Sequence, residues 1–354
     1  MYDVVVVGAG PGGAVAGKRC AERGLRTLVL EKRRLPREKV CSGLVLGRLA
    51  GNLIAQEFGP IPEEIVLRHM DGIVLWMPGI GERRVAWPTP ITWRKDLDYW
   101  MVQAAQATGA EVWDDALLRK ITPSEAGSTL SLRRDGAEQD IEARCVIGAD
   151  GAYSTVRRGM YPDEEFVTSA AYREWYPGSP HLDDGWVYVV FPMGEYRPNV
   201  WLCPKDDGFT FEGAGVKPVG GRVRALLRDA GWTETAPQWR DGCVSRAILF
   251  EHLEAGRFTP ARGNILLVGD AAGFQFPISG EGIGTSLESA LLAADAVVAH
   301  SGTGAAAEAY LAAIEPLLGT LRECYAEVAA VRAQTGEALL DAIAAAFLHS
   351  FEVG

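Results

Sequence analysis

The first thirty residues carry two short apolar runs separated by glycines, a pattern that predicts buried parallel strands. Tyr2–Val7 is rich in β-branched residues and ends at a glycine, and residues 26–30 form a second apolar run that ends at Glu31. Between them, a helix is expected from the glycines at 8–13 to about Arg23, where Gly24 ends it. The order strand, helix, strand predicts a right-handed βαβ unit.

The rest of the chain is predicted to form two kinds of sheet. Expected strands of the first part lie at 72–77, 83–86, 111–113, 118–122, 130–134, 140–143 and 145–147, with an amphipathic helix at 94–108. From 161 to 250, aromatic and polar residues alternate, as in a sheet with one covered face. A buried strand at 265–268, a helix beginning near Glu281 and an Ala- and Leu-rich helical tail from about 305 complete the pattern.

This pattern predicts an α/β protein with a discontinuous nucleotide-binding domain. We expect that domain to comprise residues 1–70, 92–160 and 255–300. A β-rich substrate domain is expected at 71–91 and 161–254, and a short helical C-terminal segment at 301–354.

Composition limits the partners, the metal sites and the cellular location that we expect for this protein. The formal net charge of −11 disfavours nucleic acid as a partner. Six cysteines without CxxC spacing predict reduced thiols and a cytoplasmic location, and five scattered histidines give no metal-ligand spacing, so no metal site is expected. No apolar run is long enough to span a bilayer, and no signal peptide is expected. The charge run at 31–37 is interpreted as a mostly solvated loop, apart from Glu31.

A glycine fingerprint follows the first predicted strand. Its residues are Gly8, Gly10, Pro11, Gly12 and Gly13, in the pattern G-x-G-x-x-G. Such glycines allow a tight turn, close approach of a pyrophosphate to the backbone, and close packing of helix on strand. Glu31 and Lys32 follow the second strand, where the carboxylate is expected to accept ribose hydroxyls and to repel a 2′-phosphate. The fingerprint alone leaves FAD and NAD as alternatives.

Two later glycine-containing turns complete the set of expected cofactor contacts. Asp150 and Gly151 follow one buried strand, and Gly269 and Asp270 follow another. A helix start beyond the latter turn can direct backbone N–H groups at flavin carbonyl oxygens. The residues expected there are Gly280, Gly282 and Ile283.

Three such sites in this order resemble the group of flavoproteins typified by p-hydroxybenzoate hydroxylase. The resemblance covers about 1–160 and 255–300, and it implies FAD as the cofactor and a Rossmann-type FAD-binding domain joined to a β-sheet substrate domain. Arg94 and Gln103 resemble positions of that group that contact FAD.

Within this group, the chain most resembles the geranylgeranyl reductase family. The segment from Pro36 to Gly43 looks like that family's loop with a Cys-x-Gly near the flavin, made here of Cys41, Ser42 and Gly43. Residues 199–205 look like its Y-x-W-x-F-P segment, although Asn199 replaces Tyr and Cys203 replaces Phe. The resemblance implies hydride transfer from reduced flavin to a carbon–carbon double bond of an apolar, isoprenoid-like or lipid substrate. Cys41 and Trp201 are the expected catalytic residues.

Three matters stay open from the sequence. An FAD-dependent monooxygenase, either a hydroxylase or halogenase-like, acting on an aromatic or polyketide-type metabolite is the alternative enzyme. A prenyl-lipid carrier resembling Rab GDP-dissociation inhibitors is a non-enzymatic alternative on the same nucleotide fold. The electron donor is expected to be external: NAD(P)H, a ferredoxin or another reductase. If the substrate is a lipid, the protein is expected to work at a membrane surface.

Overall fold

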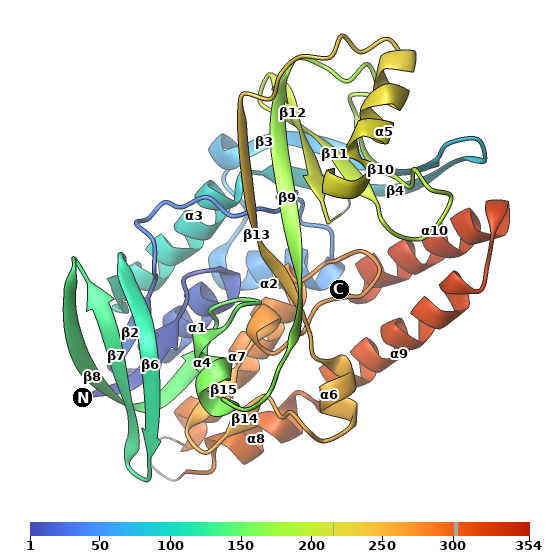
Figure 1. The fold of residues 1–354 in the computed structure, drawn as a ribbon. Helices are drawn as coiled ribbons and strands as arrows, with labels where there is room; N and C mark the ends of the chain where they lie inside the picture. The colour runs from blue at the N-terminus through green and yellow to red at the C-terminus, as the bar shows by residue number, and fades with distance from the viewer. Residues whose placement is uncertain (215, 301–303) are drawn as a thin grey trace.

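Two sheets and a set of covering helices make up the computed structural model, which describes residues 1–214, 216–300 and 304–354 (Figure 1). The predicted α/β class and the p-hydroxybenzoate hydroxylase-like arrangement are confirmed. Residues 215 and 301–303, the latter at the start of the predicted C-terminal segment, lie outside the described residues.

The first sheet is built on parallel strands whose apolar runs the sequence displays. Its order is β14(Ala261–Arg262), β15(Ile265–Leu267), β8(Ala137–Gly148), β1(Tyr2–Val7), β2(Thr27–Leu30) and β5(Glu111–Trp113). Strands β6(Ala116–Ser124) and β7(Gly127–Arg134) extend it as a hairpin that pairs with β8. β1 lies between β8 and β2, and its four valines are buried at 5% exposure or less.

The second sheet has seven strands, mostly antiparallel. Their order is β13(Trp239–Ile248), β9(Val167–Pro177), β12(Gly208–Gly213), β11(Val200–Lys205), β10(Trp186–Val190), β3(Val66–Met77) and β4(Gly81–Thr92). Alternation sends Phe209 and Phe211 to the face covered by α5(Val216–Asp229). Part of the opposite face packs on α10(Gly336–Val353), and the remainder borders the cavity described below.

The helices pack around these sheets. α1(Pro11–Glu22) lies against both α3(Arg94–Ala107) and α7(Ile283–His300), as the contacts between these elements show. The remaining helices are α2(Arg48–Phe58), α4(Thr155–Met160), α6(Phe250–Glu254), α8(Ala306–Ala313) and α9(Glu315–Arg332). Short 3-10 turns occupy Glu63–Ile65 and Gly269–Ala271.

Several predicted elements differ from the observed ones. The strands predicted at 140–143 and 145–147 are one continuous strand, β8, whose first half pairs with β7 and whose second half pairs with β1. β3 and β4 are longer than predicted, and β3 begins at Val66, before the predicted domain boundary at 71. The division into domains stays a prediction. Among the described helices, none is long and apolar enough to cross a bilayer.

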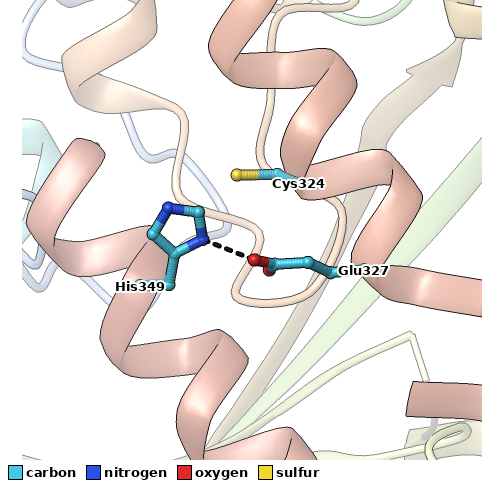
Figure 2. Close-up of side chains that lie close together, drawn as sticks. All are labelled: Cys324, Glu327 and His349. Atoms are coloured by element: carbon cyan, nitrogen blue, oxygen red, sulfur yellow. Dashed lines mark ion pairs between the residues drawn. The ribbon is translucent and has the colours of Figure 1, made fainter. Parts of the chain in front are cut away.

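The last two helices are joined by a group of side chains that the sequence did not indicate. His349 Nδ1 of α10 lies 2.7 Å from Glu327 Oε1 of α9, and Cys324 lies one turn before Glu327 (Figure 2). Candidate metal-ligand atoms of the three residues lie within 4.8 Å of one another. Because His349 is distant in sequence, spacing along the chain could not predict this group. We interpret it as an ion pair that ties α10 to α9.

Candidate functional site

One large cavity of about 1020 Å³, lined by described residues, brings the three glycine-containing sites together. Its lining includes Gly10, Asp150 and Asp270, one from each site. Cys41 and Trp201 line the same cavity from the loop after β2 and from β11. The convergence that the flavin hypothesis requires is therefore present.

Backbone hydrogen bonds at the carboxyl ends of three parallel strands hold the sites together. The amide of Ala149, after β8, donates to Val7 O of β1 at 2.8 Å. The amide of Val268, after β15, donates to Gly148 O at 3.0 Å. In open α/β sheets, ligands bind where such strand ends meet. Residues far apart in sequence thus form one edge because their strands are adjacent.

The first glycine loop is shaped for close packing and for a ligand that approaches the backbone. Gly8 has φ +105°, and a Cβ there would lie 2.3 Å from Ala149 O. A Cβ on Gly13 would lie 1.8 Å from Gly8 O, so the start of α1 can pack on β1 only without a side chain. A Cβ on Gly10 would meet only Arg37 Nη2, at 3.7 Å, and Gly10 lines the cavity. This loop fits a pyrophosphate cradle at a helix N-terminus.

A buried chain of charges runs beside this loop. Glu31 Oε2 accepts hydrogen bonds from Ala9 N at 3.3 Å and Arg37 Nε at 2.9 Å. Arg37 Nη1 donates to Asp98 Oδ2 at 2.9 Å, and Arg94 Nε donates to Asp98 Oδ1 at 2.7 Å. The hypothesis of a solvated charge run is wrong for Arg37, whose side chain is only 11% exposed. The network fixes the position of the Glu31 carboxylate.

The charges of this chain shift one another's pKa. Burial by itself raises the pKa of Asp98, but Arg94 and Arg37 outweigh it, so the pKa lies below its ordinary value. Burial by itself lowers the pKa of Arg94, but Asp98 and the neighbouring Cys41 raise it overall. Asp98 therefore stays ionised and both arginines stay charged.

In the second site, hydrogen bonds within the chain hold the Asp150 carboxylate. Asp150 accepts hydrogen bonds from Ser154 Oγ at 2.5 Å and from the amides of Thr155 at 2.6 Å and Val156 at 3.2 Å. Its carboxylate therefore holds the start of α4. Asp150 also lines the cavity, so its expected contact with the cofactor stays a prediction. Gly151 lines the cavity at φ +79°.

Arg157, on α4 just after the second site, joins that site to the third. Its Nη1 donates to Ala271 O and its Nη2 donates to Ala152 O, both at 2.6 Å. The side chain is buried, and burial lowers its pKa to about 10. These two bonds fix the distance between the loops.

The third site combines a tight turn with a helix start. Gly269 has φ +53°, and its amide donates to Ser289 Oγ of α7 at 3.0 Å. Gly280, Gly282 and Ile283 all line the cavity at the beginning of α7. Glu281, between them, is 6% exposed, and its Oε1 accepts from Gly284 N at 2.8 Å. Its Oε2 has no hydrogen-bond partner within the described chain.

Burial raises the pKa of Glu281 to about 7, which predicts a pH-dependent stability. A carboxyl with a raised pKa in the folded state stabilises the fold at low pH, and this contribution is lost as pH rises through the folded pKa. Stability is therefore expected to fall by about 3 kcal/mol between roughly pH 4.5 and 7 on account of this residue. Urea unfolding of Glu281→Gln at pH 5 and pH 8 should show that this slope is gone. Glu125→Gln, at an exposed position, is the control and should keep the wild-type change in stability between the two pH values. If Glu281→Gln loses as much stability from pH 5 to pH 8 as Glu125→Gln does, the prediction is wrong.

The Cys41 loop reaches the cavity because Gly43 is fixed to β4. Gly43 has φ +74°, and its carbonyl oxygen accepts from Thr92 N at 2.9 Å and Thr92 Oγ1 at 3.1 Å. A Cβ on Gly43 would lie 1.9 Å from Thr92 O. Cys41 and Ser42 consequently line the cavity, with Cys41 beside Arg94.

The wall opposite the glycine loops is formed by the second sheet and is more polar than expected for an isoprenoid substrate. Trp201 lies on it, its ring centroid 6.0 Å from that of Phe347 on α10. Arg173 and Glu212 also line it, with 0% and 4% exposure. Buried Lys205 lies close by and donates to Thr92 O at 3.1 Å, and burial lowers its pKa.

Most sequence-predicted residues lie at the cavity, and their roles in binding remain predictions. Gly13, Gly43 and Gly269 lie just behind the lining, where they permit close packing. Gln103 is exposed on α3 and does not line the cavity. Sequence patterns did not indicate five further residues of the site, namely Arg37, Asp98, Arg173, Glu212 and Glu281. For Glu281, its place between the predicted Gly280 and Gly282 was an available signal.

Comparisons with known proteins agree with this geometry. A family model described as FAD binding domain matches residues 88–316, and one described as NAD(P)-binding Rossmann-like domain matches residues 6–37. Protein CbrA of Escherichia coli is 27% identical over 308 residues, which cover 82% of this chain and 82% of that protein.

Two solved structures show the same fold along nearly the whole chain. A geranylgeranyl bacteriochlorophyll reductase-like protein of Thermoplasma acidophilum has a TM-score of 0.73 at 18% identity, covering 99% of this chain and 96% of that one. The FAD-dependent myxobacterial chondrochloren halogenase has a TM-score of 0.71 at 17% identity, with coverage of 99% and 96%. The FAD binding domain model covers more than half of the chain, and the cavity fits the cofactor. The chain therefore belongs to the FAD binding domain family, and it is an FAD-dependent oxidoreductase.

Proposed function

We propose that this protein reduces a carbon–carbon double bond of a largely apolar, isoprenoid-like substrate. The observation that carries the proposal is the position of Cys41: the Cys-x-Gly loop is fixed by Gly43 and brings a thiol to the cavity between the glycine loops and Trp201. FAD, when bound and reduced, supplies the hydride. An isolated alkene has no carbonyl for a side chain to polarise, so positioning and exclusion of water carry the catalysis.

In this proposal, separate groups of residues bind FAD, position the substrate and donate a proton. The first glycine loop and Glu31 hold the ADP half of FAD, and the start of α7 directs backbone N–H groups at the ring. Trp201 packs the substrate in place, and Cys41 donates the proton that completes the reduction. The match at residues 6–37 covers the loop assigned here to FAD. We therefore assign no separate nucleotide domain, and NAD(P)H, a ferredoxin or another reductase delivers electrons transiently.

A flavin monooxygenase is the second candidate, and the polar wall of the second sheet favours it. Arg173, Glu212 and Asp241 line the cavity opposite the flavin site, where an isoprenoid chain has no polar groups to match. An aromatic or polyketide-type metabolite carries such groups.

Anaerobic reoxidation of the reduced enzyme tests the reductase proposal. Geranylgeraniol is expected to reoxidise the flavin and to yield a product with two more hydrogens. Cys41→Ala should retain FAD and slow this step by about 10²-fold or more, because a positioned proton donor typically contributes at least that much. Trp100→Phe, a change on α3 outside the cavity lining, serves as the control. If oxygen uptake depends on the substrate and a hydroxylated product forms, the reductase assignment is wrong.

A further inference from the structure

Two oppositely charged side chains on the cavity wall face each other across a strand pair without bonding. β9 and β12 are antiparallel, and Arg173 is the register partner of Glu212. Both side chains line the cavity and both are almost completely buried. Directly opposite residues have Cβ atoms about 5 Å apart, and opposite charges at such positions ordinarily pair.

Other contacts hold each side chain in place. Arg173 donates to Asp241 of β13 through Nε at 3.0 Å and Nη2 at 2.7 Å. Its guanidinium carbon lies 5.3 Å from the Trp93 ring centroid and 5.0 Å from that of Trp239. Glu212 Oε1 accepts from Cys203 Sγ at 3.5 Å. Neither charged group is free to turn toward its neighbour without losing these contacts.

One polar atom on each side chain is consequently left over. Arg173 Nη1 and Glu212 Oε2 have no hydrogen-bond partner within the part of the chain that the structure describes. A buried polar atom without a partner costs about 1–3 kcal/mol, so the pair is a prepared binding element if a ligand satisfies both atoms. A guanidinium only donates hydrogen bonds, and a carboxylate only accepts them.

We propose that the substrate presents a hydroxyl group to Arg173 Nη1 and Glu212 Oε2. A hydroxyl accepts from the first atom and donates to the second, which no ether, ammonium or hydrocarbon group does. A carboxylate is disfavoured because it would lie beside Glu212, and Asp241 and Glu38 already balance the charge of Arg173. The substrate is thus an alcohol or a phenol with an apolar body. This inference rests on the proposed function only in placing the substrate at this wall.

Binding of small probes to the oxidised holoenzyme tests the inference without turnover. p-Cresol, p-xylene and 4-methylanisole share one aromatic body, and only p-cresol both donates and accepts. Their Kd values are measured from perturbation of the flavin absorbance. p-Cresol is expected to bind about tenfold or more tightly than either analogue. A plain apolar cavity would instead favour p-xylene, so equal binding of the three probes, tighter p-xylene binding, or no binding of p-cresol overturns the proposal.

Two matched variants test whether the preference for p-cresol depends on Glu212. Glu212→Gln keeps the size of the side chain but provides an amide that can donate to an ether oxygen, so the preference for p-cresol over 4-methylanisole should shrink to near unity. Glu174→Gln changes a buried glutamate on β9 that bonds Tyr176 and Arg224 and does not line the cavity, and it should leave the preference unchanged. The wild-type comparison stands even if Glu212→Gln misfolds. If p-cresol shows no binding preference, the hydroxyl proposal is wrong, and the proposed double-bond reduction is still tested separately by flavin reoxidation. If flavin reoxidation fails, the binding preference for p-cresol still tests the hydroxyl proposal.

Discussion

Gly13→Ala is expected to weaken FAD binding by about 100-fold. The added Cβ would lie 1.8 Å from Gly8 O, and a backbone oxygen in a turn between β1 and α1 cannot move aside as a flexible side chain would. The start of α1 must then shift away from the strand, and the amides of the pyrophosphate cradle shift with it. Overpacking of this kind costs about 1–3 kcal/mol, and the backbone contact places this case at the upper end.

To measure the Kd for FAD, the bound cofactor is removed and FAD is titrated back into the apoprotein. Binding is detected by the quenching of flavin fluorescence. Gly51→Ala is the matched control, because Gly51 lies within α2 and a Cβ there meets nothing within 4 Å. That variant should bind FAD normally and gain about 0.5–1 kcal/mol of stability. Wild-type affinity in Gly13→Ala would show that this loop is not the FAD cradle.

The local features of this fold were predictable from the sequence. β1 was predicted at its observed limits, because a β-branched run that ends at glycine specifies a buried strand without reference to distant residues. The three glycine-containing turns were also recognised locally, and their meeting at one cavity follows from the adjacency of β1, β8 and β15. The FAD assignment therefore needed only short-range patterns in the right order.

Features that depend on distant partners or on broken patterns were not predictable. α5 was missed because Pro218, Gly220 and Gly221 interrupt its sequence, and the apolar face that packs on the second sheet stabilises it nonetheless. Arg37 and Asp98 are 61 positions apart, and nothing in either segment indicates the other. The Arg173–Glu212 pair depends on the register of β9 and β12, which alternation alone does not specify.

Asp98→Ala is expected to destabilise the protein by about 3–5 kcal/mol, because it removes the only carboxylate that bonds both Arg94 and Arg37 among the described residues. Asp98 is 1% exposed and Arg94 7%. Breaking a buried ion pair leaves an uncompensated charge, which costs more than the pair contributed. In this variant, Arg37 keeps its ion pair with Glu31, so most of the lost stability should come from the unpaired charge of Arg94. The neighbouring Cys41 loop should become less firmly held.

Denaturant unfolding at a fixed FAD concentration measures this effect, because bound FAD itself adds stability. Asp295→Ala is the comparison: Asp295 also pairs with an arginine, Arg19, but its side chain is 50% exposed, so the loss of stability should be under about 1 kcal/mol.

The lowered pKa of Asp98 also makes the effect of Asp98→Ala on stability depend on pH. A carboxyl with a lowered pKa stabilises the fold above its unfolded pKa, and this is lost as pH falls through the folded pKa. The difference between wild type and Asp98→Ala should therefore stay constant from pH 5 to pH 8 and shrink only below about pH 4. A loss no greater than that of Asp295→Ala would mean that the buried charges do not hold the Glu31 side of the cavity in place.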